Sequence, residues 1–200
     1  KPQRILPARG KLGVLLPGMG AVTSTFIAGV ELCRRGLGTP IGSVTQLQTI
    51  RLGKRYEDRH PLIKDFVPLA DLKDLVFGGW DLFPDNMWEA ALKCGVLDKT
   101  QIEPVKAALE QIKPMTAVFD PAYIKNLKAT NAKKKATRWE LAQQVIADIQ
   151  GFKKRTGVER LVMVWCGSTE ILPKNSPAHE SLAGLEAGMK ADSPDIPPSM

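Results

Sequence analysis

The sequence predicts an α/β fold in which helices cover both faces of a doubly wound parallel sheet. Two observations predict this fold. Apolar segments of strand length alternate with segments that carry helix caps, and the apolar segments that begin at residues 12, 75 and 160 each run into a glycine-containing turn. In open sheets of this Rossmann type, ligands bind beyond the carboxyl ends of the strands. The glycine turns are therefore the first places to look for a site.

The turn Gly18-Met19-Gly20 follows the first predicted strand and precedes a predicted helix. A glycine at position 18 permits a tight turn, and a glycine at position 20 lets the backbone approach a pyrophosphate, toward which the first N–H groups of the helix point. Thr23 replaces the third glycine of the dinucleotide motif, and no acidic residue lies between Glu31 and Glu57, where the usual ribose-binding acid falls. From this motif alone, nucleotide binding and a turn that binds nothing are equally open.

The other elements are predicted from caps, prolines and apolar periodicity. Capping boxes and glycines mark the ends of most helices. The segment from Arg160 to Trp165 is a continuous apolar run, typical of a strand buried on both faces. The basic residues 51–55 are expected on a surface loop. The predicted helices are residues 24–35, a short helix capped by Asp85 or Asn86 and ending at Cys94, residues 100–112, a short helix that starts at Asp120-Pro121, residues 137–155 and residues 176–190.

Composition limits the class of protein. The chain of 200 residues, 44% of them hydrophobic, suffices for one well-buried domain or for one domain and part of another. The net charge of +7 favours anionic ligands but is spread along the chain. Three widely spaced cysteines support neither a disulfide framework nor a zinc site, and we expect reduced, mostly buried thiols. We expect no metal site, no membrane span and no signal segment at Lys1–Arg4, so a cytoplasmic location is the default.

Four segments together carry a resemblance to a known family. They are residues 12–28, the strand and turn Val76-Phe77-Gly78-Gly79-Trp80-Asp81, the sequence Phe119-Asp120-Pro121, and residues 164–170. In order and spacing they resemble the amino-terminal half of the myo-inositol-1-phosphate synthase family, also called inositol-3-phosphate synthase, and look most like its bacterial branch. The resemblance implies an NAD-dependent, redox-neutral conversion of glucose 6-phosphate to 1D-myo-inositol 3-phosphate by a homotetramer.

The resemblance also implies positions for the cofactor. The pyrophosphate turn would comprise Gly18, Gly20, Ala21 and Val22; Asp81 would contact the adenosine side; Ala117 and Val118 would flank the cofactor; and Gly167, Ser168 and Thr169 would hold it from the turn after the last strand. Five of these and neighbouring positions depart from the eukaryotic pattern. Ala21 and Val22 stand where that branch has Gly and Asn, Ala117 replaces Ser, and Lys128 and Asn131 replace Gln and Arg.

The family's catalytic and tetramerisation domain is expected to lie outside these residues. Residues 1–191 are predicted to form the NAD-binding domain and residues 192–200 a connection toward the catalytic domain. The family's chemistry is oxidation of the sugar at C5, enolisation, aldol closure and reduction, for which lysines beyond Met200 supply charge stabilisation. We therefore predict no catalytic residue within this chain and no turnover by this chain alone.

Two other classes of function stay open. One is an ordinary NAD-linked dehydrogenase that consumes its cofactor, against which the Gly78-Gly79-Trp80-Asp81 turn and the missing ribose acid argue. The other is a non-catalytic module that binds a nucleotide or a polyanion, which the charge of +7 permits. For Asp81 itself, the alternative to cofactor binding is a turn cap after the glycine pair. We expect neither a nucleic acid nor a membrane as partner.

Overall fold

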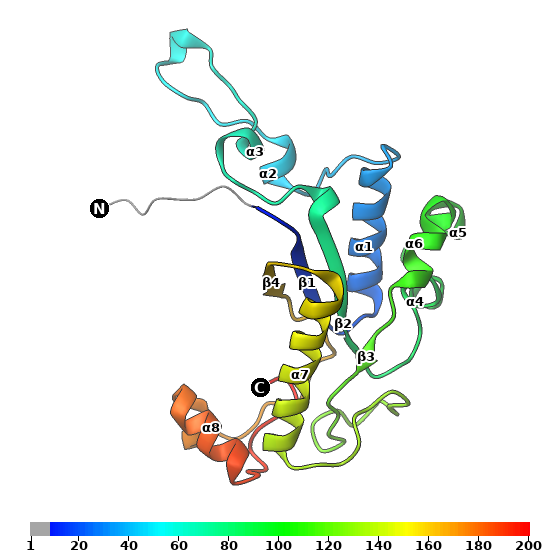
Figure 1. Cartoon of the computed structure of the whole chain (residues 1–200), viewed down its shortest axis with the longest axis vertical. Helices are drawn as coiled ribbons and strands as arrows, with labels where there is room; N and C mark the ends of the chain where they lie inside the picture. Colours follow the sequence, from blue (N-terminus) through cyan, green and yellow to red (C-terminus); the bar gives the residue numbers. More distant parts are fainter. Residues whose placement is uncertain (1–8) are drawn as a thin grey trace.

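The computed structural model describes residues 9–200 and contains a four-stranded parallel sheet (Figure 1). The strand order is β3-β2-β1-β4, so the chain starts near the middle of the sheet, adds β2 and β3 on one side and returns to add β4 on the other. This order is that of a doubly wound sheet, and the predicted fold class is confirmed. The strands are β1 (Leu12–Pro17), β2 (Leu75–Asp81), β3 (Met115–Thr116) and β4 (Arg160–Met163).

Helices pack on both faces of the sheet because side chains alternate along each strand. Val14 and Leu16 of β1 pack in one buried cluster with the helices that follow β1 and β2, whereas Leu15 packs on the opposite face with Phe152 of the long helix α7. The helices are α1 (Ala21–Arg34), α2 (Val44–Leu47), α3 (Ile63–Phe66), α4 (Met87–Cys94), α5 (Lys99–Ile102), α6 (Lys106–Gln111), α7 (Arg138–Thr156) and α8 (Leu182–Lys190), with short 3-10 turns η1 (Arg55–Glu57), η2 (Leu72–Asp74), η3 (Glu103–Val105) and η4 (Pro177–His179).

The ends of the longer helices follow their caps. Helix α7 starts after Thr137, whose side chain accepts the N–H of Glu140, and stops at Gly157 with φ +67°, close to the predicted bounds. Helix α1 begins at Ala21, three residues before the predicted start, because Gly20 is its N-cap.

Two predicted helices are divided and one does not form. Pro104 interrupts the segment predicted as residues 100–112, because proline lacks an N–H and its ring clashes with the preceding turn, so α5, η3 and α6 follow one another. Within predicted residues 176–190, Ser181 accepts the N–H of Gly184 and starts α8 anew after η4. At Asp120-Pro121 the carboxylate of Asp120 accepts the N–H of Ala122, and this side-chain bond closes a turn in place of a helix.

Strand β4 is more exposed than predicted. It ends at Met163 and pairs with β1 alone among the residues that the structure describes, so it is an edge strand. Val162 is 42% exposed and Trp165 is 50% exposed, which contradicts the expectation of a strand from 160 to 165 that is buried on both faces. An apolar run predicts burial, but in residues 9–200 no further strand pairs with the outer edge of β4.

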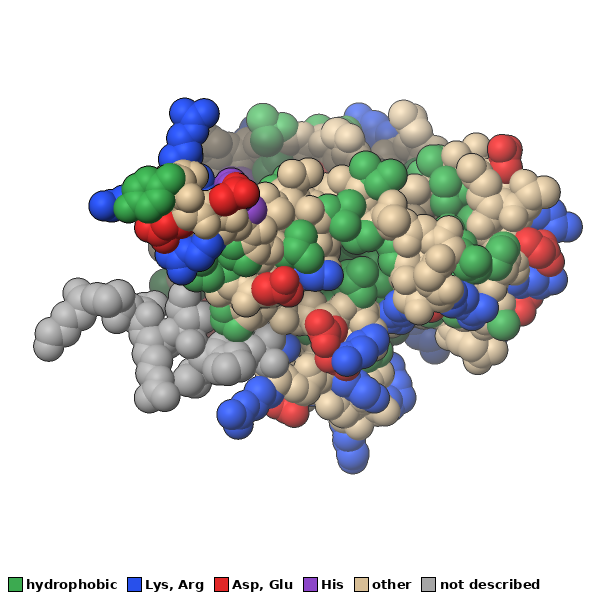
Figure 2. All heavy atoms as spheres, turned by 90° about the horizontal axis from the view of Figure 1, so that it is seen from above, with side chains coloured by type: hydrophobic (Ala, Val, Ile, Leu, Met, Phe, Trp, Pro, Cys, Tyr) green, Lys and Arg blue, Asp and Glu red, His purple; other side chains and the backbone are tan. Residues whose placement is uncertain are grey.

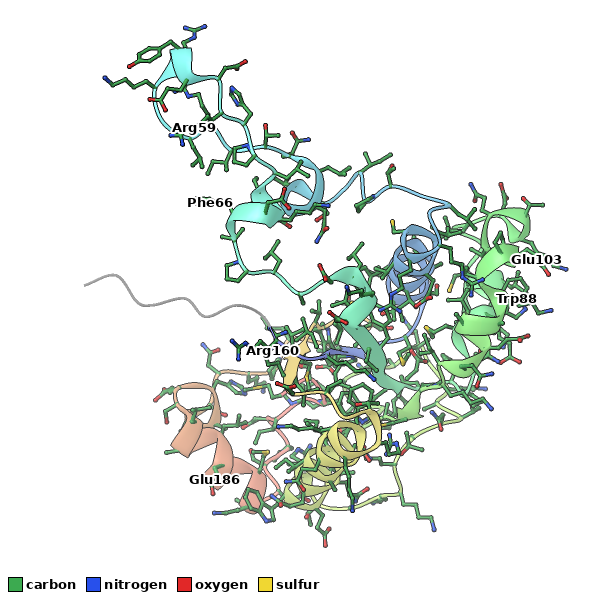
Figure 3. All side chains as sticks on the ribbon, turned by 45° about the horizontal axis from the view of Figure 1, so that its top comes forward. Arg59, Phe66, Trp88, Glu103, Arg160 and Glu186 are labelled. Atoms are coloured by element: carbon green, nitrogen blue, oxygen red, sulfur yellow. The ribbon has the colours of Figure 1, made fainter. Side chains whose placement is uncertain are left out.

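Residues 36–74, called the arm below, separate α1 from β2. The arm contains α2, η1 and α3, and two antiparallel bridges hold its sides together, Thr49 to Leu62 and Leu52 to Arg59. Figures 1 and 3 show the arm extending away from the sheet with Arg59 near its far end, whereas Trp88 and Glu103 lie on helices beside α1. Most of the basic segment 51–55 is exposed, as predicted. Figure 2 shows charges of both signs interspersed on the face that includes the arm.

Arg34, in the last turn of α1, connects the end of the arm to the sheet. Its Nε donates to the backbone oxygen of Leu72 at 2.8 Å, and its guanidinium also donates to the backbone oxygen of Leu75 and pairs with Glu31. Glu31 is buried, so this ion pair is largely shielded from water. These contacts position the start of β2 beside β1 despite the long excursion of the arm.

The segment 192–200 packs against α7. Arg138 donates to the carboxylate of Asp192 at 3.1 Å and to the backbone oxygen of Ile196 at 3.1 Å, and the side chain of Ile196 is 4% exposed. Hydrogen bonds from the backbone and side chain of Arg138 lower the pKa of the Asp192 carboxyl.

Asp148 of α7 joins the sheet to the loop that follows β3. Its Oδ2 accepts the indole N–H of Trp80 at 2.8 Å and the ammonium of Lys133 at 2.6 Å. The Lys133 side chain is 5% exposed and that of Asp148 is 26% exposed. The lysine therefore depends on this one carboxylate for its countercharge among the described residues.

We expect Asp148→Leu to destabilise the fold by about 3–5 kcal/mol, because it leaves a buried ammonium unpaired. Lys133→Met should cost less, since the remaining carboxylate keeps the Trp80 N–H and partial contact with water. Urea unfolding of the two single variants and of the double variant measures the coupling energy between Asp148 and Lys133. Equal losses for the two single variants would contradict this asymmetry.

We expect Gly78→Ala to destabilise the fold by about 1–3 kcal/mol, because overpacking a core shifts its side chains. A Cβ at Gly78 would lie 2.6 Å from Cε2 of Phe152, which is 5% exposed. Adding Phe152→Leu should relieve part of the loss. The matched control is Gly29→Ala in α1, where a Cβ meets no atom within 4 Å and stability should be unchanged or higher. Equal free energies of unfolding for Gly78→Ala and Gly29→Ala would refute the packing argument.

Candidate functional site

The turn after β1 and the turn after β4 meet at Gly18. The φ of Gly18 is +90°, and a Cβ there would lie 2.4 Å from the Cα of Gly167 and 2.5 Å from the carbonyl of Cys166. The N–H of Gly18 donates to Trp80 O at 2.8 Å, and the N–H of Cys166 donates to Pro17 O at 2.8 Å. Only glycine satisfies both the backbone conformation and the close approach. The structure thus brings together Gly18 and Gly167, two of the residues predicted to bind the cofactor.

Gly20 and the first turn of α1 form an open cradle. A Cβ at Gly20 would meet no atom within 4 Å, Ala21 is exposed and Val22 is 66% exposed. The first turn of α1 carries no acidic residue, and the first N–H groups of a helix lack intrahelical partners. Thr23, in place of a third glycine, is buried and its hydroxyl donates to Gly18 O at 2.6 Å. This geometry fits an anionic group at the start of α1.

Asp81 is the last residue of β2 and holds the glycine turn. Its Oδ2 accepts the N–H of Met19 at 2.6 Å, and its Oδ1 accepts the N–H of Phe83 at 2.9 Å. The carboxylate is therefore a turn cap, and each oxygen keeps a second lone pair for a ligand.

The same residue occupies the position where nucleotide-binding sheets carry their ribose acid. That acid stands at the end of the strand that follows the first helix, and here this strand is β2. No acidic residue lies between Glu31 and Glu57 because the arm, residues 36–74, is inserted before β2. The expectation that no acidic residue follows the second strand was therefore wrong, because Asp81 stands at the end of β2.

The residues after β3 are held from the loop that returns toward α7. The N–H of Ala117 donates to Asn131 O at 3.0 Å, and the N–H of Lys133 donates to Ala117 O at 2.8 Å. The side-chain amide of Asn131 donates to Asp81 O at 3.0 Å. Ala117 is 8% exposed and belongs to the core beneath this edge, whereas Val118 is half-buried. The amide of Asn131 therefore fixes the edge of the sheet.

A first cleft of about 290 Å³ opens beside Asp81 at the carboxyl ends of β1 and β2. Asp85 and Lys93 face each other in it, with 2.5 Å between Oδ1 and Nζ. Cys94 is exposed, contrary to the expectation of mostly buried thiols, and partial desolvation, followed by the charges of Asp81 and Asp85, raises the pKa of its thiol. The cleft is lined by Met19, Gly20, Asp81, Phe83, Asp85, Ala90, Lys93 and Cys94.

A second cleft, of about 400 Å³, lies between the turn after β4 and the loop after β3. Ser168 and Thr169 line it from one side and are exposed. Residues 123–127 line it from the other side, and the N–H of Ile171 donates to Tyr123 O at 3.0 Å, which joins the two segments. Ser168 and Thr169 thus lie apart from the cleft beside Asp81.

Several lining residues could not be identified from the sequence. Asp85 was considered as a helix cap, but Asn86 is the N-cap of α4, so Asp85 is available to Lys93.

In residues 9–200, no group of three or more His, Cys, Asp or Glu side chains is placed to hold a metal ion. The three cysteines are free. None of the helices in the described part of the chain is both long and apolar enough to cross a bilayer.

Comparison with known proteins gives one consistent result. Residues 12–200 match the NAD-binding family model of myo-inositol-1-phosphate synthase. The chain is 50% identical to inositol-3-phosphate synthase 1 of Bacteroides thetaiotaomicron over 99% of its own length and 46% of that protein. It is 31% identical to inositol-3-phosphate synthase 1 of Oryza sativa subsp. japonica over 94% of its length and 40% of that protein.

Solved structures support the fold. The inositol-3-phosphate synthase of Caenorhabditis elegans superimposes with a TM-score of 0.85 at 24% identity, covering 95% of this chain and 41% of that one. A synthase-related protein of Thermotoga maritima superimposes with a TM-score of 0.57 at 16% identity, covering 94% of this chain and 42% of that one. The chain thus spans less than half the length of these proteins. It belongs to the myo-inositol-1-phosphate synthase family and corresponds to the family's NAD-binding domain.

Proposed function

We propose that this chain is the NAD-binding half of an inositol-3-phosphate synthase, which isomerises glucose 6-phosphate to 1D-myo-inositol 3-phosphate with no net use of NAD. The observation that carries the proposal is the open cradle at Gly20 above the first turn of α1, in a chain 50% identical to a synthase of that name. When bound, NAD supplies both the oxidation and the later reduction of the sugar. The chain's own residues bind and orient the cofactor.

The pyrophosphate is assigned to the cradle. Gly18 closes the turn, and Gly20, Ala21 and Val22 present backbone to the ligand, since a Cβ at Gly20 meets no protein atom and Ala21 and Val22 are exposed. Helix N–H groups and the partial positive charge of the helix end favour the two negative charges of a pyrophosphate.

The remaining contacts are assigned to the two sides of the cradle. Asp81 offers its free lone pairs to the adenosine ribose from the first cleft. The backbone at Ala117 and Val118 flanks the cofactor and is held by Asn131 and Lys133. Across the cradle, Gly167, Ser168 and Thr169 hold the cofactor, with the two hydroxyl side chains facing the second cleft.

The catalytic groups are assigned to a part of the protein outside residues 1–200. Residues 1–191 form the NAD-binding domain in this proposal, and residues 192–200 lead toward the catalytic and tetramerisation domain. The exposed apolar side chains of β4 support it, because further protein would bury them. Three free cysteines are consistent with a reducing compartment such as the cytoplasm.

An ordinary NAD-linked dehydrogenase is the second candidate, and the position of Asp81 at the end of β2 favours it as much as the synthase. The two differ in the fate of the cofactor. A full-length protein containing this chain, supplied with NAD and glucose 6-phosphate, should form inositol phosphate with no accumulation of NADH at 340 nm. NADH formed in step with sugar oxidation would instead identify a dehydrogenase.

We expect Gly20→Ser to leave stability nearly unchanged and to weaken NAD binding at least tenfold, which corresponds to about 1.4 kcal/mol. Serine is a good N-cap, and its side chain occupies the space assigned to the pyrophosphate. Calorimetric titration with NAD and a thermal melt measure the two effects.

Gly18→Ser is the matched variant. A serine at position 18 would have to adopt a φ of +90°, and its Cβ would clash with Gly167. We therefore expect Gly18→Ser to reduce the free energy of unfolding by about 1–3 kcal/mol. Wild-type affinity for NAD in Gly20→Ser would overturn the assignment of the cradle.

A further inference from the structure

The first cleft contains an ion pair that the cofactor assignment does not use. Asp85 and Lys93 both line it, and their side chains are 22% and 67% exposed. Lys93 lies in the last turn of α4, while Asp85 precedes the N-cap Asn86, so the pair spans the length of this short helix. Lys93 is the basic residue of the cleft lining, and its ammonium is directed to a carboxylate.

The titratable charge of this cleft is negative. Asp81 and Asp85 each contribute a carboxylate and Lys93 one ammonium, which leaves one net negative charge. Cys94 lines the same cleft, and its thiol pKa is raised by desolvation and, to a smaller extent, by the charges of Asp81 and Asp85. This net negative charge would repel a dianionic group that enters the cleft.

We propose that Asp85, by holding Lys93, makes this cleft reject a ribose 2′-phosphate and so determines a preference for NAD over NADP. The inference rests on the proposed function, which places the adenosine ribose beside Asp81. In nucleotide-binding sheets, an acid at this strand end binds the 2′-hydroxyl, whereas a nearby cation accommodates a 2′-phosphate. Lys93 is a cation in this cleft, but its ion pair with Asp85 keeps its ammonium from binding a phosphate.

Two consequences of the pair disfavour NADP. With Lys93 on Asp85, the phosphate finds no free ammonium in the cleft lining. An ion pair with an exposed lysine is weak, so the phosphate could draw Lys93 away. The Asp85 carboxylate is then left beside the phosphate without its countercharge. Either arrangement leaves a like-charge repulsion, so removing the Asp85 charge is the change that admits a 2′-phosphate.

The test uses variants that change one charge at a time. Asp85→Asn keeps the side-chain shape and frees Lys93, and Lys93→Met removes the ammonium but keeps most of the apolar stem. The Kd values for NAD and NADP are measured by calorimetric titration at low salt, and the ratio of the NADP to the NAD value is compared. Asp71→Asn is the control, because Asp71 pairs with Lys73 in an equally local ion pair outside the cleft.

Asp85→Asn should lower the ratio at least tenfold, Lys93→Met should raise it, and the double variant should return it toward wild type. The Asp71→Asn ratio should equal that of wild type. Thermal melts establish that each variant is folded, and Lys93, at an exposed position, supplies the test if Asp85→Asn does not fold. NAD binding by wild type with no change of ratio in either single variant refutes the inference alone. Failure of the wild-type chain to bind NAD overturns the proposed function and the inference with it.

Discussion

The close approach of the backbone at Gly18 to that at Gly167 determines the geometry of the whole carboxyl edge of the sheet. With φ +90° at Gly18, the chain turns over the end of β1 and donates its N–H to Trp80, so β1, β2 and the turn after β4 are fixed at one point. Any side chain at position 18 would separate the two turns. The cradle at Gly20 exists because this contact directs the following residues outward into the start of α1.

A second close approach lies beneath the site. Phe152 of α7 packs on Gly13 of β1 and Gly78 of β2, where a Cβ would come within 2.9 Å and 2.6 Å of its ring. Helix α7 therefore lies close to the sheet, and Asp148, one turn before Phe152, reaches the indole of Trp80. Trp80 immediately precedes Asp81, so packing on this face also holds the strand end that carries the acid.

The sequence predicted those features that depend on neighbouring residues. A capping residue and a terminal glycine located α4, a capping box located α7, and apolar runs located β1 and β2, because these signals act within a few residues. The exposure of β4 depends on whether another strand lies beside it, which its own residues do not determine. The motif around Asp81 singled this residue out as a candidate for cofactor binding, although the arm places it later in the chain than a ribose-binding acid usually falls. The pairing of Asp85 with Lys93 depended on which of two adjacent residues caps α4, and the local pattern left both open.

Asp81 holds the glycine turn and is also the residue proposed to bind the ribose, whereas Asp85 holds no part of that turn. One lone pair of each Asp81 oxygen holds a backbone N–H, at Met19 and at Phe83, so a substitution there disturbs the glycine turn as well as any ribose contact. The carboxylate of Asp85 contacts the ammonium of the exposed Lys93 side chain, and the glycine turn does not depend on that contact. A chain built this way can change its preference between phosphorylated and unphosphorylated ribose at residue 85 while the turn stays intact. In this proposal the Asp85 carboxylate determines the cofactor preference, and the Asp81 carboxylate supports the turn. Because the two charges lie on different residues, the preference can change with little loss of stability.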